Sequence, residues 1–128
     1  MKKLCMIASF AFILAACQES LEDRCERETK EFTAKQCPLQ MDSNTRIDSL
    51  TFERATHTIH YYYTLTGRAD DEEVLKQINP AQLLKTELKN NTTMRVYKEN
   101  KYGFAYTYHS EKDPQKVLFE ITFTDKDY

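Results

Sequence analysis

The sequence contains no tryptophan and only two glycines among its 128 residues. The scarcity of glycine argues against the glycine-rich loops that cradle phosphates in nucleotide-binding proteins. The four cysteines include no Cys-x-x-Cys pair, which is the usual spacing of zinc ribbons and thiol oxidoreductases. A formal net charge of −2 argues against a nucleic-acid partner. We therefore expect neither a cofactor, nor a metal site, nor nucleic-acid binding.

The longest apolar run is also too short to span a membrane. It covers residues 4–14, about 11 residues, whereas a membrane-spanning helix needs about 20. Lys2 and Lys3 precede this run, and Leu14-Ala15-Ala16-Cys17 ends it. This arrangement resembles the signal peptide and lipobox of bacterial lipoproteins. The alternative is an ordinary secretory signal in which Cys17 has no special role.

The lipobox resemblance implies cleavage before Cys17, with lipid on that thiol and on the new amino terminus. Two acyl signals hold a protein firmly to a bilayer. Gln18, rather than aspartate, follows Cys17, and by resemblance to enteric sorting this implies the outer membrane. The acidic stretch over residues 19–23 is similar to the tethers of Bacteroidetes-type surface lipoproteins. We expect a lipid-anchored envelope protein, and the leaflet and the side of the membrane stay open.

The mature chain is expected to form one domain. Removing residues 1–16 from 128 leaves 112, a usual length for a single domain with a short tether, and changes the net charge from −2 to −4 because Lys2 and Lys3 are lost. We assign residues 17–24 to a lipidated tether and residues 25–128 to the domain, and we expect a monomer.

Cys25 and Cys37 are the two cysteines left for oxidation outside the cytoplasm. On one continuous helix they would lie about 18 Å apart, beyond the limit of about 7 Å for a disulfide. A bridge between them requires Cys25 to sit in a tether that folds back. The disulfide, two free thiols and an intermolecular bond therefore all remain open.

The pattern along the chain predicts an α+β domain. Residues 20–36 favour a helix, with Ser20 as its cap and Pro38 as its end. Alternation over residues 46–66 predicts two strands with a turn near 54–57. Two helical segments follow, over 70–78 and 79–90, with Pro80 at the kink. Residues 92–99 fit an edge strand or a short helix, and we favour the helix.

The last third predicts a hairpin with strands near 102–109 and 117–124. One face of each strand is aromatic or aliphatic, and the other is mostly small or polar. This alternation describes an antiparallel sheet with one covered face. We predict a sheet of about four antiparallel strands with helices on one face, in the order helix, two strands, kinked helix, two strands.

Most tyrosines and phenylalanines are expected in the core, since tyrosine rings fill space while their hydroxyls reach the rim. Tyr62 is the exception, because it shares the outward face with polar residues. The candidate binding face consists of His60, Tyr62, Thr64, Thr107, His109 and Thr122.

Catalytic candidates are few. His57 and His60 are three residues apart, so on one strand they face opposite sides. His60, His109 and Glu120 would form a metal or proton-transfer site only if the sheet order brought their strands together. No serine has the glycine-flanked context of a nucleophile elbow. We predict no catalytic residues, with a small hydrolase using His60, His109 and Glu120 as an alternative.

Two further resemblances bear on function. Asp48-Ser49-Leu50 resembles the acceptor motif for O-glycosylation in some Bacteroidetes, which implies a glycan on Ser49. Gln36-Cys37-Pro38, residues 45–49 and 61–65, and Tyr106-Thr107-Tyr108 are similar to a family of small uncharacterised exported α+β domains.

The sequence thus predicts an envelope binding or adaptor domain whose partner is a protein or a glycan. The alternative within binding is an acidic inhibitor of a cationic enzyme such as lysozyme.

Overall fold

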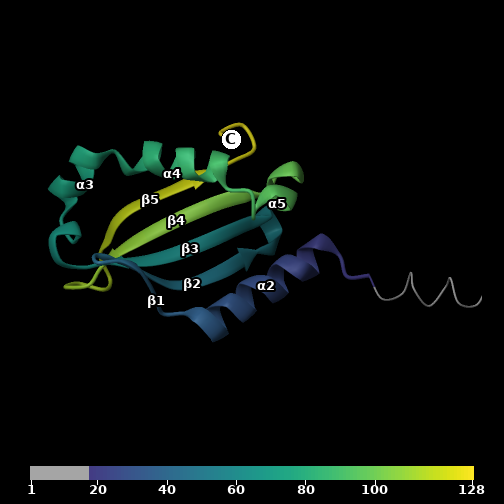
Figure 1. Cartoon of the computed structure of the whole chain (residues 1–128), viewed down its shortest axis with the longest axis horizontal. Helices are drawn as coiled ribbons and strands as arrows, with labels where there is room; N and C mark the ends of the chain where they lie inside the picture. Colours follow the sequence, from purple (N-terminus) through teal and green to yellow (C-terminus); the bar gives the residue numbers. More distant parts are fainter. Residues whose placement is uncertain (1–17) are drawn as a thin grey trace, which may run out of the picture.

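The structure, a computed structural model, describes residues 18–128. The expected signal peptide and Cys17 lie outside the described residues. The chain forms an α+β fold, as predicted, with one sheet and with helices before β1 and between β3 and β4 along the chain (Figure 1). In chain order the elements are α2 (Leu21–Gln36), β1 (Leu39–Asp42), β2 (Thr45–Glu53), η1 (Arg54–Thr56), β3 (Thr58–Leu65), η2 (Gly67–Ala69), α3 (Glu72–Ile78), α4 (Pro80–Asn90), α5 (Arg95–Glu99), β4 (Gly103–Ser110) and β5 (Val117–Phe123).

Helix α2 begins and ends where its local signals predict. The Ser20 hydroxyl accepts a hydrogen bond from the Asp23 amide at 3.1 Å, and Pro38 follows the C-cap residue Cys37. Arg24 and Glu28, one turn apart, form an ion pair at 2.7 Å. Residues 21–24, which we assigned to the tether, are therefore helical. The cap and the ion pair extend the helix into that polar segment, so the described tether shrinks to residues 18–20.

The two predicted hairpins are present. Strands β2 and β3 pair antiparallel around η1, and β4 pairs antiparallel with β5. The short helix predicted within residues 92–99 is α5. Pro80 occupies the first turn of α4, and Asn79 before it adopts the left-handed conformation without a side-chain cap. The kink predicted at Pro80 is therefore a change of helix.

The sheet differs in two details from the predicted one of about four antiparallel strands. The sheet has five strands in the order β1-β2-β3-β4-β5, because the four residues of β1 add an edge strand beside β2. Strands β3 and β4 pair in parallel. Helices α3, α4 and α5 carry the chain back along the sheet, so β4 starts at the same end as β3.

The helices lie on one face of the sheet, as predicted. Helix α2 follows the β1–β2 side, and α4 follows the opposite side near β5 (Figure 1). The core lies between these helices and the sheet, and its buried members are Cys25, Ile47, Leu50, Ile59, Leu84, Leu88, Tyr97, Tyr102, Phe104, Tyr106 and Phe123. Within residues 18–128, no helix has the length and apolar character needed to cross a bilayer.

Candidate functional site

The predicted outward face is linked by hydrogen bonds across three strands. His60 on β3 contacts the Thr107 hydroxyl on β4 through Nε2 at 2.7 Å. Thr107 donates its proton to Glu120 on β5 at 2.6 Å, so Nε2 of His60 must donate to Thr107. Nδ1 of His60 contacts the carboxylate of Glu53. This network fixes the ring of His60 between the Glu53 carboxylate and the Thr107 hydroxyl.

The other members of this face have different surroundings. Tyr62 stacks on His60 with ring centroids 4.1 Å apart. Thr64 donates to Asp48 at 2.5 Å. Nδ1 of His109 is buried without a partner among the described residues, and Thr122 is exposed. The six residues do share one face, but most of its polar groups already bind each other.

The structure brings only part of the alternative catalytic set together. His60 and Glu120 both bind Thr107, whereas His109 takes no part in that network. The Thr107 side chain that joins them is buried, with 2% of the residue exposed. Among residues 18–128, no group of three or more histidine, cysteine or acidic side chains is placed to hold a metal ion.

Both described cysteines belong to α2 or its cap, and both are free thiols. Cys25 packs in the core, and burial raises the pKa of its thiol to about 12. Cys37 is half-buried, and burial also raises the pKa of its thiol. A thiol with a raised pKa is a poor nucleophile near neutral pH.

Ser49 lies at an irregularity in β2. The register with β3 shifts between Ile47 and Ser49, so Asp48 is an extra residue in the strand. Because of this bulge, Asp48 reaches Thr64 on the outward face while Ser49 is paired with Tyr62. Asp48 and Ser49 of the resembled acceptor motif thus lie on the side away from the helices, whereas Leu50 belongs to the core.

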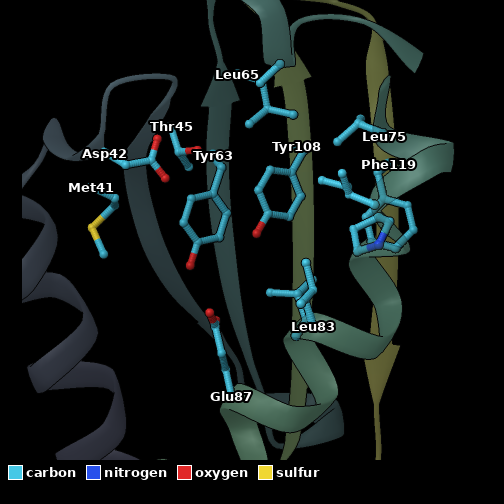
Figure 2. Close-up of a pocket in the computed structure, with 14 residues that line it drawn as sticks. Met41, Asp42, Thr45, Tyr63, Leu65, Leu75, Leu83, Glu87, Tyr108 and Phe119 are labelled. Atoms are coloured by element: carbon cyan, nitrogen blue, oxygen red, sulfur yellow. The ribbon is translucent and has the colours of Figure 1, made fainter. Parts of the chain in front are cut away.

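The opposite face carries a feature that the sequence did not predict, a groove between α2 and the α3–α4 segment. It consists of two adjoining cavities of about 360 and 550 Å³, which share Met41, Tyr63 and Glu87. Its floor is the tyrosine set of β3 and β4. We call it the tyrosine groove, and Figure 2 shows one end of it.

The parallel pairing of β3 and β4 builds the floor. It places Tyr61 beside Tyr106 and Tyr63 beside Tyr108. The rings of these two pairs stack nearly parallel, with centroids 5.0 and 4.6 Å apart. Burial raises the pKa of all four hydroxyls, so they remain neutral donors across the physiological range.

The rim of the groove is apolar and exposed. Met41 on β1, Ile78 at the end of α3 and Leu83 on α4 are 56%, 50% and 54% exposed. Leu83 points over the floor near Tyr108, and Met41 lies on the opposite side (Figure 2). Large apolar side chains gathered around a cavity are typical of a binding site.

The charged groups of the groove are all acidic. Asp42 and Glu87 line one cavity, and Glu28 and Glu87 line the other. Among the described residues that line it, none is lysine, arginine or histidine. Glu87 extends from α4 toward Tyr63 (Figure 2), and its charge adds to the rise that burial causes in the pKa of Tyr63.

The sequence contained one signal for this groove. Tyrosine, rather than phenylalanine, occupies all four floor positions, and a hydroxyl group is expected where a ring reaches a wet surface. We assigned these rings to the core, with their hydroxyls at its rim. They do pack on the core, but their outer edges form the floor of an open cavity.

One protein-family model matches the sequence. It is described as Domain of unknown function (DUF8479), and it matches residues 20–119. The chain belongs to this family. The DUF8479 match runs from the cap of α2 into β5, so it includes both walls and the floor of the tyrosine groove. No curated protein matches the sequence.

Solved structures with a similar fold include two bacterial proteins. PA3611 from Pseudomonas aeruginosa, assigned as a secreted protein, has a TM-score of 0.63 at 14% identity, and the match covers 86% of this chain and 98% of that one. The type II secretion system pilotin AspS from Vibrio cholerae has a TM-score of 0.59 at 13% identity, covering 90% and 98%. At these identities the likeness of the DUF8479 chain to both shows a shared fold.

Proposed function

We propose that this protein is a lipid-anchored adaptor of the bacterial cell envelope, which holds a partner polypeptide in the tyrosine groove. The observation that carries this proposal is the rim, where Met41, Ile78 and Leu83 are half or more exposed around a formed cavity. Burying them against a partner would remove a large apolar surface from water. The two fold neighbours, one secreted by assignment and one a secretion pilotin, support a role in the envelope.

The position of the lipobox supports a close anchor. Helix α2 starts at Leu21, four residues after Cys17. Four extended residues span at most about 14 Å, so lipid on Cys17 would hold α2 next to the bilayer. Because α2 is one wall of the tyrosine groove, the partner would also be held at the membrane surface. We place the anchor in the outer membrane, on the basis of Gln18 after the cysteine.

We further propose that the protein is not an enzyme. The titratable groups of the outward face are tied to each other, with His60 held between Glu53 and Thr107. The hydroxyl at the centre of this network is buried, so a substrate does not reach it. The network therefore stiffens the sheet, and the tyrosine groove on the other face does the binding.

The anchor is tested by labelling cells with an alkyne-bearing fatty acid and separating their membranes. We expect label on the wild-type protein, which co-fractionates with the outer membrane. Cys17→Ser should lose the label and leave the membrane fraction. Label that persists in Cys17→Ser would contradict lipidation at this residue.

The groove is tested by photo-crosslinking in cells. A benzophenone amino acid replaces Leu83 on the rim or, as the matched control, Thr122 on the outward face. We expect a discrete protein adduct from position 83 and none of comparable yield from position 122. An adduct from position 122 alone would move the binding surface to the outward face.

A further inference from the structure

Resting on the proposed adaptor function, we infer that the partner segment in the tyrosine groove is an amphipathic α-helix that places a lysine or arginine opposite Glu87. Two observations carry this inference. The two strands that form the floor of the groove are already paired on both sides, and the charged side chains that line the groove among residues 18–128 are all acidic.

The backbone of the floor is fully used by the sheet. Strand β3 pairs with β2 and β4, and β4 pairs with β3 and β5. The walls are the helices α2 and α4, whose backbone groups bond within each helix. An extended segment lying here would bury amide and carbonyl groups without partners. A helix satisfies its own backbone, so it is the occupant that suits this paired floor.

The size of the groove fits a short helix. Helix α4, which forms one wall, has 11 residues and is about 16 Å long. A partner helix of three turns would match that length. Its apolar side chains, spaced three and four residues apart, would contact the tyrosine floor and the exposed rim.

Glu87 is the acid that is free to bind a cation. Glu28 already accepts hydrogen bonds from Arg24 and from the Tyr97 hydroxyl, both at 2.7 Å. Asp42 accepts from the Asn44 amide at 2.8 Å. Glu87 has no hydrogen bond or ion pair within residues 18–128, although it lies on the side shared by both cavities. A basic side chain on the partner would therefore find its counter-ion here.

The test combines the benzophenone at position 83 with charge reversal in the full-length protein in cells. Glu87→Lys should lower the adduct yield about tenfold, since close charge pairs at interfaces contribute at least that factor. Glu99→Lys on α5 makes the same change of charge outside both cavities, and it should leave the yield unchanged. Unchanged thermal melts of both variants would confirm that neither loses its fold.

Mass spectrometry of the adduct supplies the second readout. We expect a partner peptide with apolar residues at helical spacing and a lysine or arginine within one turn of the crosslinked residue. Changing that residue to glutamate should restore the adduct in the Glu87→Lys background. An adduct that survives Glu87→Lys, or a peptide without a basic residue, overturns this inference while the adaptor function stands. The absence of any adduct at position 83 overturns both.

Discussion

Two neighbouring leucines on α4 separate structural packing from binding. Leu84 is 7% exposed and belongs to the core, whereas Leu83 is 54% exposed and belongs to the rim. Leu84→Ala should cost about 2–5 kcal/mol of folding free energy, because it leaves a cavity in the core. Leu83→Ala should cost about 0.5 kcal/mol or less, as is usual for a surface position.

These values translate into a clear thermal difference. For a domain of this size, about 1 kcal/mol shifts the melting temperature by roughly 4 °C. Leu84→Ala should therefore lower it by about 8 °C or more, and Leu83→Ala by about 2 °C or less, as measured by circular dichroism. Partner capture, followed with a crosslinker at Met41, should instead fall several-fold in Leu83→Ala. Equal destabilisation by both substitutions would refute the assignment of Leu83 to an open rim.

Three further predictions concern other parts of the molecule. Thr107→Val removes the hydroxyl at the centre of the outward-face network, and it should lower the free energy of unfolding by about 2 kcal/mol, as measured by urea denaturation. A decrease near zero would show that the network does not stabilise the fold. At pH 8 iodoacetamide should modify Cys37 and should spare Cys25 until the protein is unfolded. The reason is that burial raises the pKa of the Cys25 thiol to about 12, which leaves almost no thiolate. Equal labelling of the two cysteines in the folded protein would contradict the burial of Cys25. If Ser49 is glycosylated in the native organism, the intact mass should carry a hexose increment that Ser49→Ala removes, and an unmodified wild-type mass would dispose of the glycan.

The elements that local signals specify are the ones that the sequence predicts well. Ser20 and Pro38 mark the ends of α2 because capping and proline geometry involve only a few neighbouring residues. The alternation in β4 and β5 similarly reveals which side chains share a face. Strand β1 escapes this reasoning, since four residues are too few to show a period.

The features that the sequence did not predict depend on how elements far apart in the chain pack together. The parallel pairing of β3 with β4 depends on how far the three intervening helices carry the chain. A helical segment between two strands is itself a signal for such a crossover. The tyrosine groove depends on where α2 and α4 lie over the sheet. Leu83 and Leu84 are the same residue type side by side, and only the packing decides which one is exposed. The partners Glu53 and Asp48 of the outward face likewise come from a neighbouring strand and its bulge.

Occupancy of the tyrosine groove in the cell is the most direct test of this account. Single cysteines are placed at Leu83 or Thr122 in a Cys37→Ser background, and their maleimide labelling rates are compared between intact cells and the purified protein. We predict that Leu83→Cys reacts several-fold more slowly in cells, while Thr122→Cys reacts at the same rate in both. Equal rates for Leu83→Cys, with protection of Thr122→Cys in cells, would contradict the groove and identify the outward face as the contact surface.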